Sequence, residues 1–165
     1  MESWRRIYHI PEDFSLSCPS KEVSALVSSW PTKIVFYHEQ LQYGLRFPLS
    51  FIILSFYRDF NVPLSQIHPK TICLLLALQE LFSEEEELLT TDRLLHHYYP
   101  TRSGLSTFVL LKARRFSFTG MDPDGNTSSR ERYGYVTHPD FNELPKHWVS
   151  TLANRIAPPP TSHEK

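Results

Sequence analysis

The stretch KTICLLLALQELF, residues 70–82, decides the fold of this chain. A helix over these residues would carry apolar side chains on nearly every side, and a helix that is apolar all round is normally buried. Just before it, residues 48–60 (PLSFIILSFYRDF) place apolar side chains from Leu49 to Phe60 on one helical stripe, with Pro48 in the first turn. The sequence therefore predicts a central buried helix and an amphipathic helix packed on it.

Shorter helices are expected on either side of this pair. Ser20 suits the N-cap of a short helix that ends before Pro31, and helical spacing resumes at residue 34 and stops at Gly44, a typical C-cap residue. The prolines in residues 62–69 leave room for only a turn or one 3₁₀ coil. A further short helix is expected from Thr90 or Thr91 to the residue before Pro100.

Beyond residue 104 the apolar period shortens towards two, which is typical of strands. Strands are predicted at residues 105–111 and 114–118. Turn residues at 121–126 would join them to a partner strand at 130–136 in a hairpin, and the apolar spacing of residues 145–156 predicts a final helix.

Together these elements predict an α+β domain with a helical N-terminal half, a small antiparallel sheet and a C-terminal helix that covers the sheet. The length of 165 residues suits one domain, which we place at residues 20–156. Residues 1–19 show no clean period and are expected to form an irregular lead-in, and residues 157–165 a Pro-rich tail.

Composition excludes several classes of protein. With 17 basic and 18 acidic residues the formal net charge is −1, which argues against a basic nucleic-acid coat and an acidic solvating chain. The 41% hydrophobic and 13% aromatic fractions are too high for a disordered chain. A core should form, and a charged partner would have to meet a local patch.

The ends and the cysteines predict an intracellular protein without a membrane span, although nucleus and cytoplasm are not distinguished. No secretory leader is visible, and the longest apolar run, residues 72–78, is far shorter than the roughly 20 residues that cross a bilayer. Cys18 and Cys73 form no CxxC pair, and the 8 histidines share no HExxH pattern. We therefore expect no metal and no cofactor.

A family resemblance rests on residues 36–69. The core phrase Gly-x-Arg-Phe-Pro (Gly44, Arg46, Phe47 and Pro48), a helix, and the turn Leu-Ser-Gln-x-x-Pro that contains Gln66 and Pro69 resemble the gypsy-type transposon (gypsy-type transposase) domain of plant proteins. The resemblance implies retrotransposon ancestry and supplies no activity and no catalytic residues. Many relatives continue into a polar linker and a coiled coil, so this chain would be a fragment or a solo domain.

No catalytic residue is predicted from the acidic positions. Asp122 and Asp124 fall in an expected turn, the glutamates at 84–87 are typical of a solvated helix end or loop, and no Asp-Thr-Gly or Asp-Ser-Gly loop occurs. We expect a protein that is not an enzyme, and rank a magnesium-dependent nuclease or recombinase as the last alternative.

Basic and aromatic residues of the predicted strands form a candidate nucleic-acid site, because guanidinium groups pair with phosphates and aromatic rings stack on bases. The alternative is that the aromatic residues pack the sheet while the basic residues face water. At the Gly44 corner we favour a structural role, with Arg46 bonding carbonyls of the preceding helix, over a partner contact anchored by Arg46 and Phe47. The candidate nucleic-acid residues are Lys112, Arg114, Arg115, Phe116, Arg132 and Tyr135.

Two functions rank ahead of the nuclease or recombinase. The first is a non-catalytic module that binds a protein partner or itself. The alternative is a module that binds single-stranded nucleic acid through the basic and aromatic strands.

Overall fold

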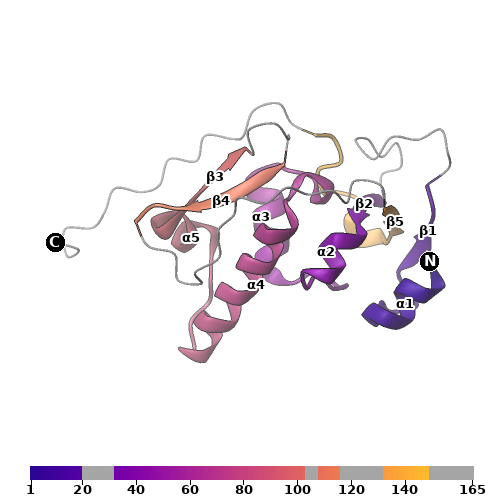
Figure 1. The fold of residues 1–165 in the computed structure, drawn as a ribbon, viewed down its shortest axis with the longest axis horizontal. Helices are drawn as coiled ribbons and strands as arrows, with labels where there is room; N and C mark the ends of the chain where they lie inside the picture. Colours follow the sequence, from indigo (N-terminus) through magenta and orange to yellow (C-terminus); the bar gives the residue numbers. More distant parts are fainter. Residues whose placement is uncertain (20–31, 103–107, 116–131, 149–165) are drawn as a thin grey trace.

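The structure is a computed structural model that describes residues 1–19, 32–102, 108–115 and 132–148 (Figure 1). Within these residues five α-helices, two 3₁₀ helices, a three-stranded antiparallel sheet and a two-stranded antiparallel sheet make up a mixed α+β fold. The α+β class is confirmed. The predicted helix after Ser20, the turn at 121–126 and the tail at 157–165 lie outside the described residues.

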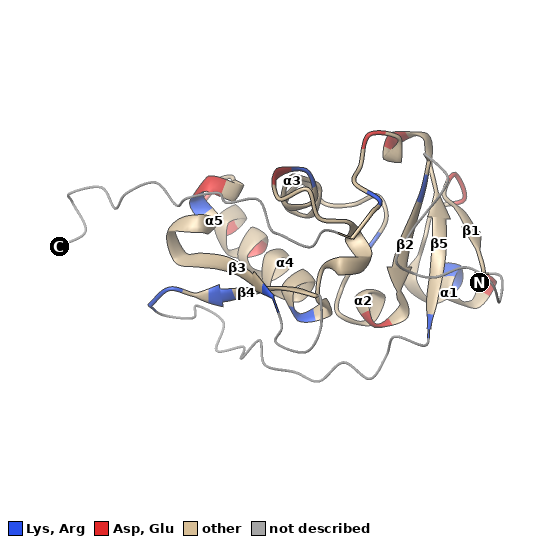
Figure 2. Cartoon of the chain, turned by 90° about the horizontal axis from the view of Figure 1, so that it is seen from above, with Lys and Arg blue, Asp and Glu red and all other residues tan. Residues whose placement is uncertain are grey.

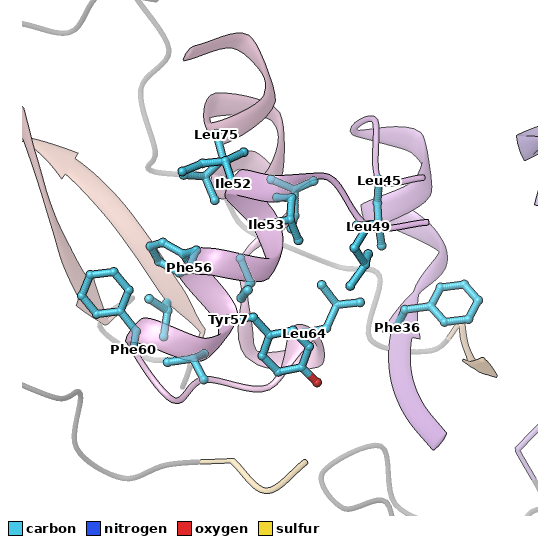
Figure 3. Close-up of a cluster of buried hydrophobic side chains, with 14 of the residues drawn as sticks. Phe36, Leu45, Leu49, Ile52, Ile53, Phe56, Tyr57, Phe60, Leu64 and Leu75 are labelled. Carbon is cyan, nitrogen blue, oxygen red and sulfur yellow. The ribbon is translucent and has the colours of Figure 1, made fainter. Parts of the chain in front are cut away.

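The helical core is built as the apolar spacing predicts. Helix α3 (Phe51–Asp59) turns one stripe inward, and the 3₁₀ helix η1 (Leu64–Gln66) links it to helix α4 (Pro69–Glu84). Helix α3 begins after its N-cap Ser50, so Pro48 precedes the helix instead of lying in its first turn. Figure 3 shows the resulting apolar cluster, in which the buried α3 side chains are Ile52, Ile53, Phe56 and Tyr57.

Helix α4 is buried on one side only, so the prediction of a helix covered all round is wrong. Helices α2 and α3 and strand β4 pack against its inner side, where Ile72, Leu75 and Leu78 are buried. Cys73 is partly exposed and Leu81 is exposed on the outer side. In Figure 1 the last turns of α4 extend past the other helices and strands. Apolar composition alone does not bury a face that no other element covers.

A three-stranded sheet joins the two ends of the described chain. Its order is β1 (Ser15–Ser17), β5 (Tyr133–Thr137) and β2 (Lys33–Tyr37), and β5 pairs antiparallel with both neighbours. Residues 34–37 were expected to be helical, but the helix that ends before Gly44 is only α2 (His38–Gln42). The β-branched and aromatic side chains of residues 33–37 favour a strand once a partner strand is present.

The expected irregular lead-in is also wrong, because residues 1–19 contain helix α1 (Glu2–Tyr8) as well as β1. Helix α1 contacts the sheet through Trp4, whose ring lies edge-on to Phe36 of β2, and it also contacts His38 at the start of α2. The Trp4 ring stacks on the His38 ring with centroids 4.7 Å apart, and Tyr8 Oη lies 3.0 Å from His38 Nε2. Burial, followed by the charge of Arg132, lowers the pKa of His38.

The second sheet is separate from the first. Helix α5 (Thr91–His97) leads into β3 (Tyr98–Arg102), which pairs with β4 (Val109–Ala113). The expected hairpin between the strands near 114 and 130 is therefore wrong, since β5 belongs to the three-stranded sheet. Helix α5 ends at His97, before the predicted residue 99, because the chain from Tyr98 onward pairs with β4.

The C-terminal described segment holds the 3₁₀ helix η2 (Pro139–Phe141). Residues 145–148 are not helical, and the remainder of the helix expected at 145–156 lies outside the described residues. Over the described part of the chain, no helix combines the length and the apolar character needed to cross a bilayer.

Candidate interaction site

The two-stranded sheet carries a basic surface, which we call the β3–β4 face: Tyr99, Lys112, Arg114 and Arg115. Tyr99 and Lys112 are cross-strand partners, and the Tyr99 side chain is 39% exposed. Residues 98–102 and 108–115 contain basic side chains but no Asp or Glu. Figure 2 shows the positive charge on β4 and at its end. This face is therefore a local positive patch on a chain of nearly zero net charge.

Arg114 is fixed in place by the end of helix α5. Its backbone N–H donates to the His97 carbonyl at 2.8 Å, and its Nε donates to the Leu95 carbonyl at 2.8 Å. Carbonyls in the last turn of a helix have no partner inside the helix, so these bonds satisfy two such groups. The Arg114 guanidinium carbon lies 5.6 Å from the centroid of the Tyr99 ring. Arg114 thus caps α5 and holds the exposed ring of Tyr99 beside a positive charge.

The structure does not bring the whole predicted nucleic-acid cluster together. Lys112, Arg114 and Arg115 belong to β4 or follow it, whereas Arg132 and Tyr135 belong to the segment of β5 in the other sheet. Figure 2 shows the two strands in different parts of the molecule. Phe116 lies outside the described residues.

Tyr135 packs inside the three-stranded sheet. Its side chain is buried, its Oη makes no hydrogen bond among the described residues, and Lys33 Nζ lies 5.2 Å from its ring centroid. Burial, followed by the neighbouring Tyr133, raises the pKa of Tyr135. Tyr135 therefore agrees with the alternative prediction, in which the aromatic side chains pack the sheet.

The Gly44 corner has the structural role that its sequence predicts. Gly44 has φ +103°, a conformation that glycine adopts readily. Arg46 Nη1 donates to the Leu41 carbonyl at 2.8 Å and to the Leu45 carbonyl at 2.7 Å. Phe47 is buried against other aromatic rings, so it anchors no exposed contact.

The other motif residues also support the core. Gln66 is fully buried in η1, and Pro69 is the buried first residue of α4. The exposed ring of Pro48 follows Phe47 and leads to α3. The motif residues thus lie in the connection between α2 and α3, in η1 and at the start of α4.

Gln40 is a buried polar residue that our sequence analysis did not identify. Its Oε1 accepts a hydrogen bond from the Tyr37 N–H at 2.9 Å, and its Nε2 donates to the carbonyls of Leu64 at 2.7 Å and Ile67 at 2.8 Å. A glutamine at the third helical position that bonds back to the N-cap N–H is half of a capping box. Because the helix was expected to start at residue 34 and α2 starts at His38, Gln40 was not recognised as its third residue.

A second feature missed from the sequence is the α4 tip, which we define as residues 81–88. Leu81 is 44% exposed and Leu88 is 57% exposed, although both are large apolar side chains. The glutamates at residues 84–87 are exposed between them. The acidic run was predicted to be a solvated helix end or loop, and the exposed glutamates at the end of α4 and in the turn after it confirm this. The exposed leucines were not predicted.

Arg93 holds the α4 tip in a defined conformation. It forms an ion pair with Glu87, donates from Nη1 to the Leu88 carbonyl at 3.2 Å, and places its guanidinium carbon 5.9 Å from the Phe82 ring centroid. The Arg93 N–H also donates to Thr90 Oγ1 at 3.3 Å, the N-cap bond of α5. Leu81, in the last turn of α4, and Leu88, after the helix, therefore flank a segment that Arg93 contacts at Phe82, Glu87 and Leu88.

Within the described residues, no group of three or more His, Cys, Asp or Glu side chains could hold a metal ion. Comparison of the chain with protein-family models, with curated proteins and with solved structures finds no match. The gypsy-type resemblance therefore stays a prediction. The features of the described residues that bear on function are the α4 tip and the β3–β4 face.

Proposed function

We propose that this chain is a non-catalytic, retrotransposon-derived domain that binds another protein chain through the α4 tip. The observation that carries the proposal is the exposure of Leu81, in the last turn of α4, and of Leu88, which follows the helix and whose carbonyl is bonded by Arg93. Exposed apolar side chains gain free energy when a partner removes them from water. A turn that is already ordered loses less conformational entropy on binding.

The partner is expected inside the cell. Cys18 and Cys73 are both free thiols, and Cys18 is exposed. Free, exposed thiols persist best in a reducing compartment, which supports an intracellular location.

A capture experiment tests the proposal. The purified chain, immobilised as wild type and as Leu81→Ser/Leu88→Ser, is incubated with cell extract, and the retained proteins are identified by mass spectrometry. Ile7→Ser is the control, because Ile7 is 60% exposed on α1, away from the α4 tip. These exposed sites should change stability by only about 0.5 kcal/mol or less.

A protein retained by the wild type and by Ile7→Ser, but lost with the double variant, is the expected result. Equal retention by all three chains would refute a contact through the α4 tip. An absence of any retained protein and of self-association would refute the interaction domain itself.

The second candidate function is binding of single-stranded nucleic acid on the β3–β4 face. The observation that favours it is the exposed Tyr99 ring flanked by Arg114 and Lys112, because base stacking and phosphate pairing need that combination. Arg132 and Tyr135, in the other sheet, are not part of this narrower site.

Fluorescence anisotropy of labelled single-stranded RNA at low and physiological salt tests this second function. Lys112→Ala/Arg115→Ala should weaken binding and flatten the logarithmic salt slope by about 1.4, at about 0.7 for each lost phosphate contact. Arg114 stays in place because it caps α5. Arg6→Ala/Arg58→Ala is the charge-matched control, since both side chains are exposed elsewhere. Equal affinity of the two double variants would refute the site.

A further inference from the structure

Opposite charges gather on two described surfaces of this chain. The α4 tip carries four glutamates at residues 84–87, of which Glu87 pairs with Arg93. The β3–β4 face carries Lys112, Arg114 and Arg115 with no acidic residue on its strands. A formal net charge of −1 for the whole chain therefore coexists with two local patches of opposite sign.

We propose that the partner of this domain is a second copy of the same chain, with the α4 tip of each copy bound to the β3–β4 face of the other. The proposal rests on the proposed function, since it uses the same α4 tip. It adds the identity of the partner and the surface that the tip contacts.

Helix α5 joins the α4 tip to the β3–β4 face within each chain, so both surfaces lie close enough together to take part in one reciprocal contact. Its first residue, Thr91, follows the α4 tip, and its last turn is bonded to Arg114 of the β3–β4 face. Helix α5 lies between the two surfaces. It has seven residues, and at a rise of about 1.5 Å per residue it is about 10 Å long. In Figures 1 and 2 the end of α4, α5 and the second sheet all lie on the side away from α1. With a two-fold axis on that side, the α4 tip of each copy could contact the β3–β4 face of the other copy.

The chemistry of the two surfaces is complementary in more than charge. The α4 tip offers Leu81 and Leu88, and the β3–β4 face offers the exposed ring of Tyr99. The carboxylates of Glu84 and Glu85 suit the cations of the other face. Charge pairs at the rim of an interface orient the encounter and penalise wrong partners, while the apolar contact is removed from water.

Two charge-reversal variants test the pairing without disturbing the fold. Glu84→Lys/Glu85→Lys reverses the tip but leaves Glu86, which has φ +57°, and the Glu87 pair with Arg93 unchanged. Lys112→Glu/Arg115→Glu reverses the face but keeps Arg114 as the cap of α5. The control for the tip variant is Glu12→Lys/Glu143→Lys, which makes the same change in charge at exposed positions outside both surfaces, and Arg6→Glu/Arg58→Glu is the corresponding control for the face variant.

Sedimentation velocity over a concentration series at low salt measures the dimer. The wild type and the controls should dimerise, and each reversed variant should have a dissociation constant raised about tenfold or more, because like charges now meet. An equimolar mixture of the two reversed variants should restore the dimer, since each basic surface then meets an acidic one. Raised salt should weaken the wild-type dimer.

Three results would overturn the proposal. One is a wild type that stays monomeric at every concentration; another is a dimer that neither reversed variant weakens. The third is a mixture that fails to restore association. Loss of single-stranded RNA binding with Lys112→Glu/Arg115→Glu, combined with a monomeric wild type, would assign the face to nucleic acid instead. The interaction domain would survive each of these results if the Leu81→Ser/Leu88→Ser variant still lost a captured protein.

Discussion

Replacing Gln40 with alanine should lower the free energy of unfolding by about 3 to 5 kcal/mol. Gln40 is fully buried and bonds the Tyr37 N–H and the carbonyls of Leu64 and Ile67. It therefore ties the end of β2 to η1 and to the residue that follows η1. The substitution would leave three backbone groups in the core without these bonds.

The magnitude follows from counting those groups. Each hydrogen bond contributes a net of about 1 kcal/mol, and a buried group left without a partner costs about 1 to 3 kcal/mol. Partial relaxation and entry of water would recover some of that cost. The expected loss is a large share of the roughly 5 to 15 kcal/mol that stabilises a typical domain.

Urea unfolding followed by circular dichroism measures this loss. With an m-value near 2 kcal/mol per molar, the midpoint should fall by about 2 M. Gln42→Ala is the control, because Gln42 is the exposed residue at the end of the same helix. A midpoint for Gln40→Ala within about 0.3 M of the control would refute the argument.

A second variant separates the hydrogen bonds from the cavity. Gln40→Glu keeps nearly the same volume and an acceptor for the Tyr37 N–H, but at neutral pH it turns a carboxylate oxygen towards the carbonyls of Leu64 and Ile67. It should be at least as unstable as Gln40→Ala at pH 7 and should gain stability relative to it when acid protonates the carboxyl group. Similar stability of Gln40→Glu and the wild type at neutral pH would contradict the donor role of the amide.

Three smaller perturbations follow from other contacts. Gly44→Ala should cost about 1 to 2 kcal/mol in thermal unfolding, since its φ is +103° and its Cβ would lie 3.1 Å from an α4 side chain; an unchanged melting temperature would count against this. Arg93→Ala should cost less than about 1 kcal/mol overall but speed amide hydrogen exchange across the α4 tip, and unchanged exchange would disprove the clamp. Burial and Arg132 lower the pKa of His38, so the unfolded state binds the proton more readily than the folded state. The free energy of unfolding should therefore fall as the pH drops below the ordinary pKa of 6.5. His38→Phe should flatten this pH dependence between pH 7.5 and 5.5, and equal slopes for the variant and the wild type would argue against it.

Elements set by local signals were predictable from the sequence. The apolar stripe of α3, the proline-bounded turn at η1 and the threonine cap of α5 each depend on residues a few positions apart. The role of Arg46 was also predictable, because a guanidinium beside the end of a helix finds carbonyls there.

Elements set by distant pairing were not predictable in the same way. Residues 33–37 fit a helical spacing as well as a strand, and the choice depends on β5, far along the chain. Strand β5 itself was expected, but a neighbouring partner was assumed because most hairpins join consecutive strands. That error also produced the candidate cluster that combined Arg114 with Arg132 and Tyr135.

The α4 tip shows a different limit of sequence reasoning. Leu81 continues the apolar pattern of α4, and nothing in that pattern marks where the covering elements stop. Only the packing shows that α2, α3 and β4 cover the inner side of α4 while Leu81 remains exposed. The exposed surface is therefore a property of the assembled fold.

The sheet order β1-β5-β2 has a consequence for the nascent chain on the ribosome. The middle strand, Tyr133–Thr137, is synthesised last, and both earlier strands pair with it. Until that strand leaves the exit tunnel, the N-terminal strands lack the partner that joins them, whereas α3 and α4 can already pack. Residues 34–37 are apolar or aromatic and favour strands, so during this interval they would be a target for a chaperone.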